Sequence, residues 1–300
     1  MLFPETIMTM QEKPKDTMAK VQKKTHEERV EGFYSRTSSS RAHEADGFLS
    51  FGLWDPCVKD YEGSTENLLK SFLQNGYLDK GGVILNVACG YGAETVRIYE
   101  TLKPERIHAI DITAAHIDHA RTRAIDLKLD HKIHFEKRNA CETRFPDSFF
   151  TKVLGIEGPA HFKTRELFFK ECHRILSDGG TLLLTDITAN MENINRSLFR
   201  RVLAVFVARI WHMPHANWMT HRQYRDRMEA AGFRVDFFHS LGERVFPGFS
   251  RFNTRWSSII NAIRTRGFFH GLGITFISWM LGYVHKKNML DYVYVKAVKV

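Results

Sequence analysis

The chain has 300 residues, of which 43% are hydrophobic and 26% charged, a size that suits one large domain or one domain with insertions. Its four cysteines include no C-x-x-C pair, which argues against a zinc site and a disulfide framework. The net charge of +9 is uneven, because residues 196–300 hold 17 Lys and Arg against 5 Asp and Glu. Such a basic region is typical of contact with nucleic acid, an anionic membrane or an anionic substrate, and an ordinary solvated surface is the alternative.

The N-terminal part divides into two segments. Residues 1–28 are polar and are expected to be mobile, and an N-terminal cap is expected over 29–80, with order beginning near Val30. An aromatic stretch at 47–56 is interpreted as a lid or pocket wall, and residues 65–76 as an amphipathic helix. The first residues lack a basic stretch followed by an apolar run, so no secretory signal is expected, and free thiols favour a cytoplasmic location.

Strands and helices then alternate, which predicts an α/β fold with a Rossmann-like, seven-stranded, mostly parallel sheet whose last strand is antiparallel. The expected strands are 83–87, 107–111, 133–137, 152–156, 181–186, 233–239 and 291–298. The expected helices are 93–102, 114–127 with Thr113 as its cap, 165–176 with a C-terminal turn at Ser177–Gly180, and 220–231.

Two insertions, 187–219 and 241–290, interrupt this alternation and are expected to form helical lids over the acceptor pocket. Residues 267–284 contain no Lys, Arg, Asp or Glu, but these 18 residues are at the lower limit for a membrane span. Because a strand of the sheet follows at once, a buried pair of lid helices or an interfacial segment is favoured over a crossing. Residues 198–211 form a second apolar stretch that also carries arginines.

The stretch from Val83 to Thr95 reads V-I-L-N-V-A-C-G-Y-G-A-E-T, a strand that ends in a glycine-rich turn and leads into a helix. It resembles motif I of the class I S-adenosylmethionine-dependent methyltransferases, although Asn86 and Ala88 replace the usual acidic residue and first glycine. The sequence I-D-I-T at 110–113 resembles motif II, R-N-A-C at 138–141 resembles motif III, and the R-x-L-x-x-G-G turn follows at 174–180. The resemblance implies that residues 29–300 form one such domain and that S-adenosylmethionine is its cofactor.

Carried onto this sequence, the resemblance implies a cofactor site of ten residues. Asp111 would accept the ribose hydroxyls, Ile112 would pack on the adenine, and Asn139 stands where an Asp often meets the adenine amino group. Tyr34 would close over the cofactor, with core packing as the alternative. The expected cofactor-binding residues are Tyr34, Asn86, Ala88, Cys89, Gly90, Gly92, Asp111, Ile112, Asn139 and Ala140.

Residues 155–166 and the F-x-x-x-G-x-W segment at 48–54 are similar to the small-molecule "type 11" branch, which includes sterol, tocopherol, isoprenoid and macrolide-sugar methyltransferases. Glu157 and His161 follow the fourth strand and are the candidate catalytic groups, because a hydroxyl or carbon acceptor needs help with its proton. A structural histidine, and a carboxylate that only hydrogen-bonds to the cofactor, are the alternatives. Aromatic residues expected in the acceptor pocket are Phe48, Phe51, Trp54 and Trp211, and no metal ligand set is apparent.

The favoured function is methyl transfer to a lipophilic small molecule, at oxygen or carbon, with peripheral membrane contact and homo-oligomers compatible with it. An RNA methyltransferase that uses the basic C-terminal third is one alternative, although nucleic acid is not the expected partner. A methyltransferase-fold binding protein without turnover is the other, suggested by Asn86, Ala88 and Asn139.

Overall fold

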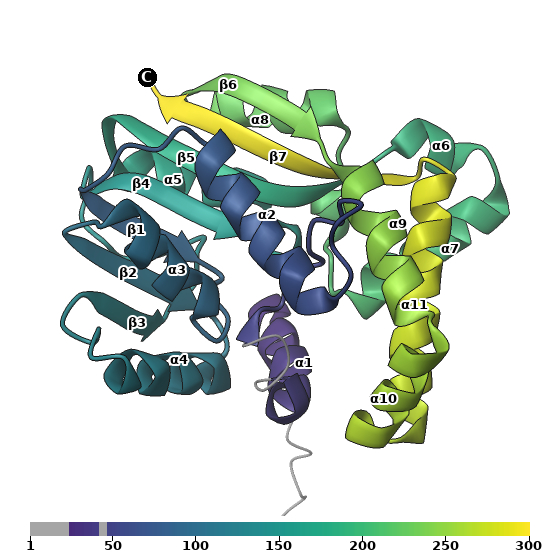
Figure 1. Ribbon diagram of the computed structural model, residues 1–300. Coiled ribbons are helices and arrows are strands. Elements are labelled where there is room, and N and C mark those ends of the chain that lie inside the picture. Colours follow the sequence, from purple (N-terminus) through teal and green to yellow (C-terminus); the bar gives the residue numbers. More distant parts are fainter. Residues whose placement is uncertain (1–23, 42–46) are drawn as a thin grey trace, which may run out of the picture.

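The computed structural model describes residues 24–41 and 47–300 (Figure 1). Most of the segment expected to be mobile, 1–28, therefore lies outside the described residues. Its last three residues belong to helix α1 (His26–Arg41), so ordered structure begins before Val30.

The centre of the molecule is one seven-stranded sheet in the order β3-β2-β1-β4-β5-β7-β6. Strand β7 runs antiparallel to both of its neighbours, and the other pairs are parallel. This confirms the predicted fold class. The strands are β1 (Val83–Val87), β2 (Arg106–Asp111), β3 (Ile133–Lys137), β4 (Phe150–Ile156), β5 (Leu176–Ala189), β6 (Phe233–Ser240) and β7 (Leu290–Lys299).

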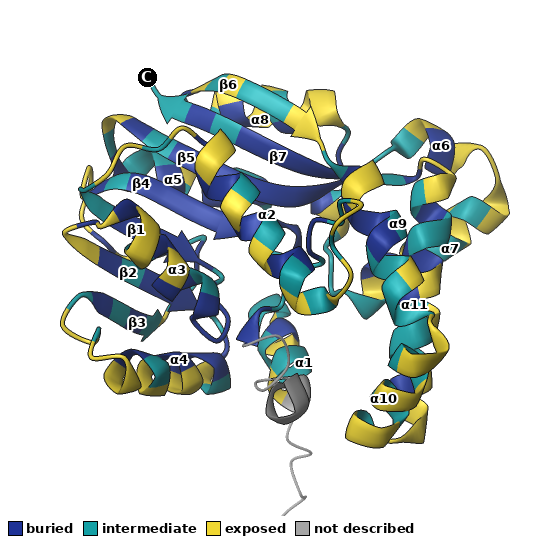
Figure 2. Cartoon of the chain, viewed as in Figure 1, coloured by how far each residue is buried: buried dark blue, intermediate teal, exposed yellow. Residues whose placement is uncertain are grey.

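Helices cover both faces of the sheet, and its inner strands are buried between two apolar layers, whereas the edge strand β6 is largely accessible (Figure 2). Side chains alternate between the layers along each strand, so Ile84 packs into one and Leu85 into the other. The first layer is completed by α2 (Tyr61–Asn75), α3 (Ala93–Leu102) and α4 (Ala114–Asp126). The second is completed by α5 (Arg165–Ile175) and α8 (His221–Ala230). Near-continuous apolar strands are what a sheet buried on both faces requires.

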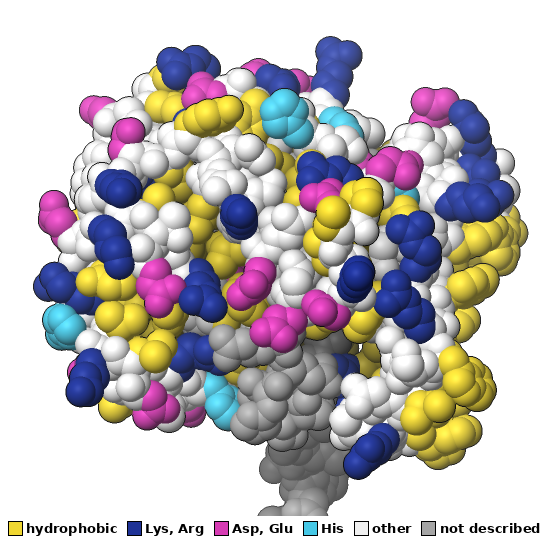
Figure 3. Space-filling view, viewed as in Figure 1, with side chains coloured by type: hydrophobic (Ala, Val, Ile, Leu, Met, Phe, Trp, Pro, Cys, Tyr) yellow, Lys and Arg dark blue, Asp and Glu magenta, His cyan; other side chains and the backbone are white. Residues whose placement is uncertain are grey.

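The two insertions form helices that gather at one side of the sheet (Figure 1). The first contributes α6 (Met191–Asn195) and α7 (Leu198–Ile210), and the second α9 (Gly242–Asn253), α10 (Trp256–Arg266) and α11 (Phe268–Lys286). Hydrophobic and basic side chains share the outer surface of this part of the molecule (Figure 3). Within the described residues, no helix has the length and apolarity that crossing a bilayer requires.

Of the two arrangements expected for 267–284, the structure does not show a fully buried pair of lid helices. Helix α11 packs against both α9 and α10, but α10 has no buried residue, and α11 keeps several aromatic side chains exposed. The pair therefore covers the cavity with one face and presents the other outward.

Three local predictions also need correction. Helix α2 begins at Tyr61 instead of 65, because the Asp60 side chain accepts a hydrogen bond from the Gly63 backbone and caps it there. Thr113 is the N-cap residue of α4, as expected, but its hydroxyl makes no capping hydrogen bond.

The third correction concerns the turn before β5. Helix α5 ends at Ile175 with Leu176 already extended, and the glycines after it lie within β5. The pairing of β4 with β5 is irregular at this point, which accommodates the extra residues as a bulge.

Candidate functional site

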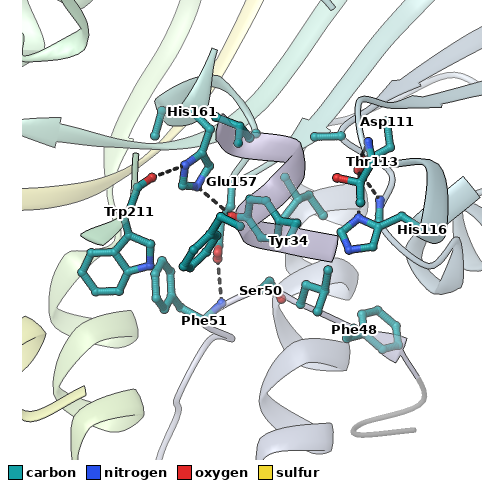
Figure 4. A pocket seen from close by; sticks show the side chains of 18 of the residues that line it. Tyr34, Phe48, Ser50, Phe51, Asp111, Thr113, His116, Glu157, His161 and Trp211 are labelled. Carbon is teal, nitrogen blue, oxygen red and sulfur yellow. Dashed lines mark hydrogen bonds and ion pairs between the residues drawn. The ribbon is translucent and has the colours of Figure 1, made fainter. Parts of the chain in front are cut away.

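A cavity of about 870 Å³ lies beyond the carboxyl ends of β1, β2 and β4 (Figure 4). Its walls come from α1, the segment 47–51, the turn after β1, the end of β2, the segment 138–140, the segment 156–163 and the inner faces of the insertion helices. Ligands of open α/β sheets bind at this edge. The volume is near the upper end of the 300–1,000 Å³ that is typical of ligand pockets.

The turn between β1 and α3 is built from three residues in left-handed conformations. Ala88, Gly90 and Gly92 have φ angles of 53°, 50° and 80°. A Cβ at Gly92 would lie 2.7 Å from the ring of Phe135, so this glycine serves the packing of α3 against the neighbouring elements and does not line the cavity. Ala88, Cys89 and Gly90 do line it.

Asn86 is the second expected cofactor residue that the structure places elsewhere. Its amide donates to the Thr95 hydroxyl at 2.8 Å inside the protein, and it does not line the cavity. The hydrogen bond ties β1 to α3, so Asn86 supports the turn instead of touching a ligand.

Asp111 ends β2 at the cavity wall, where its carboxylate accepts hydrogen bonds from the Gly90 and Thr113 backbones at 3.1 and 2.8 Å. The ring of His116 lies 3.4 Å from the same carboxylate. Burial alone would raise the pKa of Asp111, but His116 and the two backbone donors outweigh it and hold the pKa below its ordinary value. The group is therefore an anion that can accept the two hydroxyls of a ribose.

Other expected cofactor residues line the same end of the cavity, namely Tyr34, Ile112, Asn139 and Ala140. The Asn139 oxygen accepts a hydrogen bond from the Cys141 backbone at 2.9 Å, which fixes the side chain at the wall. The hydroxyls of Ser50 and Thr113 are buried there and find no hydrogen-bond partner within the described part of the chain. Buried hydroxyls of this kind fit a ligand with polar groups, as a nucleoside-containing cofactor has.

His161 projects into the cavity from the short helix η2 (Pro159–His161) after β4. Its Nδ1 lies 2.6 Å from the carbonyl oxygen of Trp211, and its Nε2 lies 3.1 Å from the hydroxyl of Tyr34 (Figure 4). A carbonyl can only accept, so Nδ1 carries the hydrogen and Nε2 of the neutral ring is the acceptor. Burial lowers the pKa of His161 to about 4, so the neutral form prevails near pH 7.

Glu157 directly follows β4, four residues before His161, and its backbone is left-handed, with φ of 60°. Its Oε1 accepts hydrogen bonds from the Phe51 backbone at 2.8 Å and from the Tyr292 hydroxyl at 2.9 Å. Burial raises the pKa of Glu157 to about 8, and the nearby carboxyls of Glu94 and Asp186 add to the shift. Glu94 also lines the cavity, and burial raises its pKa to about 8 as well.

The aromatic wall is formed by three of the four expected residues. Phe48, Phe51 and Trp211 line the cavity, and the rings of Phe51 and Trp211 meet edge to face with centroids 6.0 Å apart. Trp54 does not line it. Its indole N–H donates to the Phe51 carbonyl at 2.9 Å, and its ring packs against Phe252, so it supports the wall from behind.

Comparison with known proteins identifies the class of this domain. Residues 84–180 match the family model described as a methyltransferase domain. Erythromycin 3''-O-methyltransferase of Saccharopolyspora erythraea is 29% identical over 148 residues, which cover 48% of this chain and 48% of that protein. The structure of the cyclopropane synthase MmaA2 from Mycobacterium tuberculosis aligns with a TM-score of 0.76 at 15% identity, over 92% of this chain and 99% of that one.

Geranyl diphosphate C-methyltransferase from Streptomyces coelicolor A3(2), solved with S-adenosyl-L-homocysteine, gives a TM-score of 0.75 at 16% identity, over 92% of this chain and 98% of that one. The chain carries a class I S-adenosylmethionine-dependent methyltransferase domain. This confirms the resemblance drawn from the motifs. The matched segments span about half the length of the first curated relatives.

In this methyltransferase domain, a buried ion pair holds the segment that carries His161. Arg165 and Asp186 are both fully buried and are joined by two hydrogen bonds of 2.6 and 2.9 Å. Arg165 also donates to the carbonyl of Asn217, whose amide in turn donates to carbonyls in the segment 160–162. Asp186 therefore acts through Arg165 and Asn217 on the position of His161 and does not reach the cavity itself.

Several residues of the methyltransferase pocket had not been predicted. Glu94 stands directly after the glycine turn, where an acidic residue in the first turn of a helix offered a signal. Tyr292 does not line the cavity, but its hydroxyl bonds Glu157 and Thr185, and only the order of the strands brings β7 to that place. The inner faces of α10 and α11 line the far end of the cavity, so the second insertion lies where a lid was expected, although no motif marked its lining residues.

Proposed function

We propose that the protein transfers a methyl group from S-adenosylmethionine to a hydroxyl oxygen of a lipophilic small molecule. The observation that carries this proposal is His161, whose Nε2 accepts a hydrogen bond inside the cavity that Asp111 also lines. A hydroxyl acceptor must lose its proton as the oxygen–carbon bond forms, and a neutral imidazole is a suitable base.

The chain's residues divide the work between the two ends of the cavity. Asp111 and the turn at 88–90 would hold the nucleoside, and Phe48, Phe51 and Trp211 would hold an apolar acceptor and exclude water. The cofactor supplies an electrophilic methyl group on a sulfonium, from which S-adenosylhomocysteine leaves with the electron pair of the broken carbon–sulfur bond.

His161 would receive the hydroxyl proton at Nε2. The acceptor hydroxyl would either replace the Tyr34 hydroxyl as the hydrogen-bond partner of Nε2, or pass its proton to Nε2 through the Tyr34 hydroxyl. A pKa of about 4 makes His161 a weak base, but the hydroxyl becomes strongly acidic as its oxygen is alkylated, so a weak base is sufficient. The Trp211 carbonyl would stabilise the resulting imidazolium through Nδ1–H.

The lipophilic character of the acceptor is supported by the walls at the far end of the cavity. Phe249, Phe252, Ile274 and Ile277 add apolar surface beyond Trp211. The relatives fit this class, since their names include a macrolide O-methyltransferase, a geranyl diphosphate C-methyltransferase and a cyclopropane synthase.

Carbon methylation of an alkene is the second candidate, supported by the names of the two structural relatives. That reaction creates a carbocation, which aromatic rings of the cavity or a carboxylate could stabilise. Burial raises the pKa of Glu157 to about 8, which favours its neutral form at pH 7. We favour a hydroxyl acceptor because His161 offers a base for its proton.

A label-transfer assay tests the proposal. The protein is incubated with methyl-labelled S-adenosylmethionine and separate pools of alcohols, sterols, isoprenoids and total RNA, and label is counted in each extracted product. We expect label in an alcohol-containing lipid as an alkali-stable methyl ether. Label in RNA alone would contradict the lipophilic acceptor, and label in no pool while the cofactor binds would favour a binding protein without turnover.

A further inference from the structure

The outer face of α11 carries a continuous apolar stripe. Phe269, Leu272, Phe276 and Trp279 follow one another at helical spacing and are 85%, 40%, 51% and 52% exposed. The rings of Phe276, Trp279 and Tyr283 stack in sequence, with centroids 6.0 and 5.8 Å apart. Large aromatic side chains in such a row are costly to leave in water, so the stripe points to an apolar environment.

Two other insertion helices also expose apolar side chains. Helix α10 exposes Trp256 and Ile260, and helix α7 exposes five apolar side chains. Those of α7 are Leu198, Phe199, Val202, Val205 and Phe206. We call the exposed apolar side chains of α7, α10 and α11 the apolar face.

The three helices that carry the apolar face have charged side chains of a single sign. Helices α7, α10 and α11 together contain six Lys and Arg and no Asp or Glu. The wider stretch 244–290 has seven basic residues and again no acidic one. Aromatic and aliphatic side chains bordered by Lys and Arg are the pattern of helices that lie in a membrane interface and are attracted to anionic lipid headgroups.

The opposite face of α10 and α11 lines the cavity. His270, Gly273, Ile274 and Ile277 of α11 belong to the cavity wall, while Phe276 and Trp279 point away from it. Arg266 and Phe269, where the two helices meet, also belong to the cavity lining, and Phe269, which is 85% exposed, borders both the cavity and the outer stripe. The cavity that reaches Asp111 thus extends along this helix pair to the connection between the two helices.

We propose that the apolar face docks onto an anionic lipid bilayer without crossing it, so that a lipophilic acceptor passes from the lipid into the cavity along α10 and α11. The entry route rests on the proposed function, but the docking does not. A lipid surface accounts for the aliphatic side chains of α7 and the basic border together, because it offers acyl chains below a layer of negative charge. A nucleic acid would match the arginines and leave the valines and leucines of α7 in water.

The test is flotation of the full chain with vesicles of phosphatidylcholine and with vesicles that also contain phosphatidylglycerol. The variant Phe276→Glu/Trp279→Glu places two charges in the apolar face at residues outside the cavity wall. The control Ile125→Glu/Leu127→Glu makes the same charge change at exposed apolar positions on and next to α4. We expect the wild type and the control to float with the anionic vesicles and the first variant to bind at least about tenfold more weakly.

Added salt should weaken the binding of the wild type, since the headgroup attraction is screened. Titration with S-adenosylhomocysteine shows that each variant is folded, and failure of that titration in the wild type would count against the proposed function alone. Absence of wild-type flotation, or equal flotation of both double variants, would overturn the docking. A wild-type dimer in gel filtration that Phe276→Glu/Trp279→Glu converts to a monomer would assign the face to a second copy of the chain and overturn it also.

Discussion

The cofactor end of the cavity is formed by backbone turns at the ends of adjacent parallel strands, whereas the acceptor end is formed by side chains from segments far apart in the chain. Ala88 and Gly90 lie in the turn after β1, and Asp111 is the last residue of β2. These two strands pair directly. Phe51, His161 and Trp211 come from the segment 47–51, the segment after β4 and the first insertion. A site of the first kind is held by the sheet itself, and a site of the second kind depends on a few long-range hydrogen bonds.

This difference predicts that the acceptor end can be disabled while the cofactor end stays intact. We expect His161→Gln to lower kcat by about 10²–10⁴, because the base that receives the acceptor's proton is lost. The affinity for S-adenosylhomocysteine should change little. The exposed His131→Gln serves as the matched control. Equal losses of kcat in the two variants would mean that His161 has only a packing role.

The acceptor end should also depend on the buried pair of Arg165 and Asp186. Arg165→Met leaves a buried carboxylate without its partner, and we expect it to lower the free energy of unfolding by about 3–5 kcal/mol. Arg244→Met breaks a partly exposed pair with Asp55 and should cost about 1 kcal/mol or less. Denaturant unfolding measures both. A similar cost for the two variants would show that the buried pair does not hold this part of the fold.

The buried carboxyl groups of the cavity should make the stability of the fold depend on pH. Glu157 has a pKa of about 8 in the folded protein against 4.5 for an ordinary glutamate, so the folded state binds its proton more tightly. Its contribution to stability is complete below pH 4.5 and is lost as the pH rises through about 8. Thermal unfolding of the cofactor-free protein should therefore show a steeper fall in Tm over this range for the wild type than for Glu157→Gln.

Glu94 contributes a fall over the same range, so the variant should reduce the slope without abolishing it. His161 makes stability change with pH in the opposite direction. Its pKa of about 4 lies below the ordinary 6.5, so its contribution to stability is complete above pH 6.5 and is lost as the pH falls through about 4. Glu142→Gln, at an exposed position, is the control. An unchanged slope in Glu157→Gln would mean that its carboxyl is ionised in the folded protein.

The smallest effect is expected in the glycine-rich turn of the cofactor end. Ala88 has a left-handed backbone, and a Cβ at Gly158 would lie 2.6 Å from its methyl group. Ala88→Gly should raise the free energy of unfolding by about 0.5–1 kcal/mol and Tm by about 2 °C, because glycine adopts this conformation without strain. Gly158→Ala should destabilise the wild type and be tolerated better in the Ala88→Gly background. Additive effects in this double-mutant cycle would contradict the contact.

The same contrast explains what the sequence could predict. The turn after β1 and the carboxylate at the end of β2 are local features, and both lie where the motifs indicate. Asn86 was misassigned because its partner Thr95 lies one turn inside α3, and a motif position does not tell which way a side chain points. Trp54 was misassigned because the residue it packs against, Phe252, is in the second insertion.

The acceptor end could be predicted only in part. The position of His161 after β4 marked it as a candidate, but its tautomer depends on a carbonyl 50 residues away. The contact of Tyr292 with Glu157 joins residues 135 positions apart and requires the strand order. The apolar composition of 267–284 is evident from the sequence. Which side of α11 faces the cavity and which is exposed follows only from its packing against α9 and α10.

The measurement that tests the central claim most directly is calorimetric titration of the wild type and Asp111→Ala with S-adenosylhomocysteine. Hydrogen bonds to a buried carboxylate contribute about 1.5–3 kcal/mol each, so loss of two should weaken binding at least about 100-fold. The account predicts a dissociation constant of about micromolar for the wild type and no detectable binding for the variant. Absence of binding to the wild type would mean that the turn with Ala88 does not accept the cofactor, and it would contradict the account.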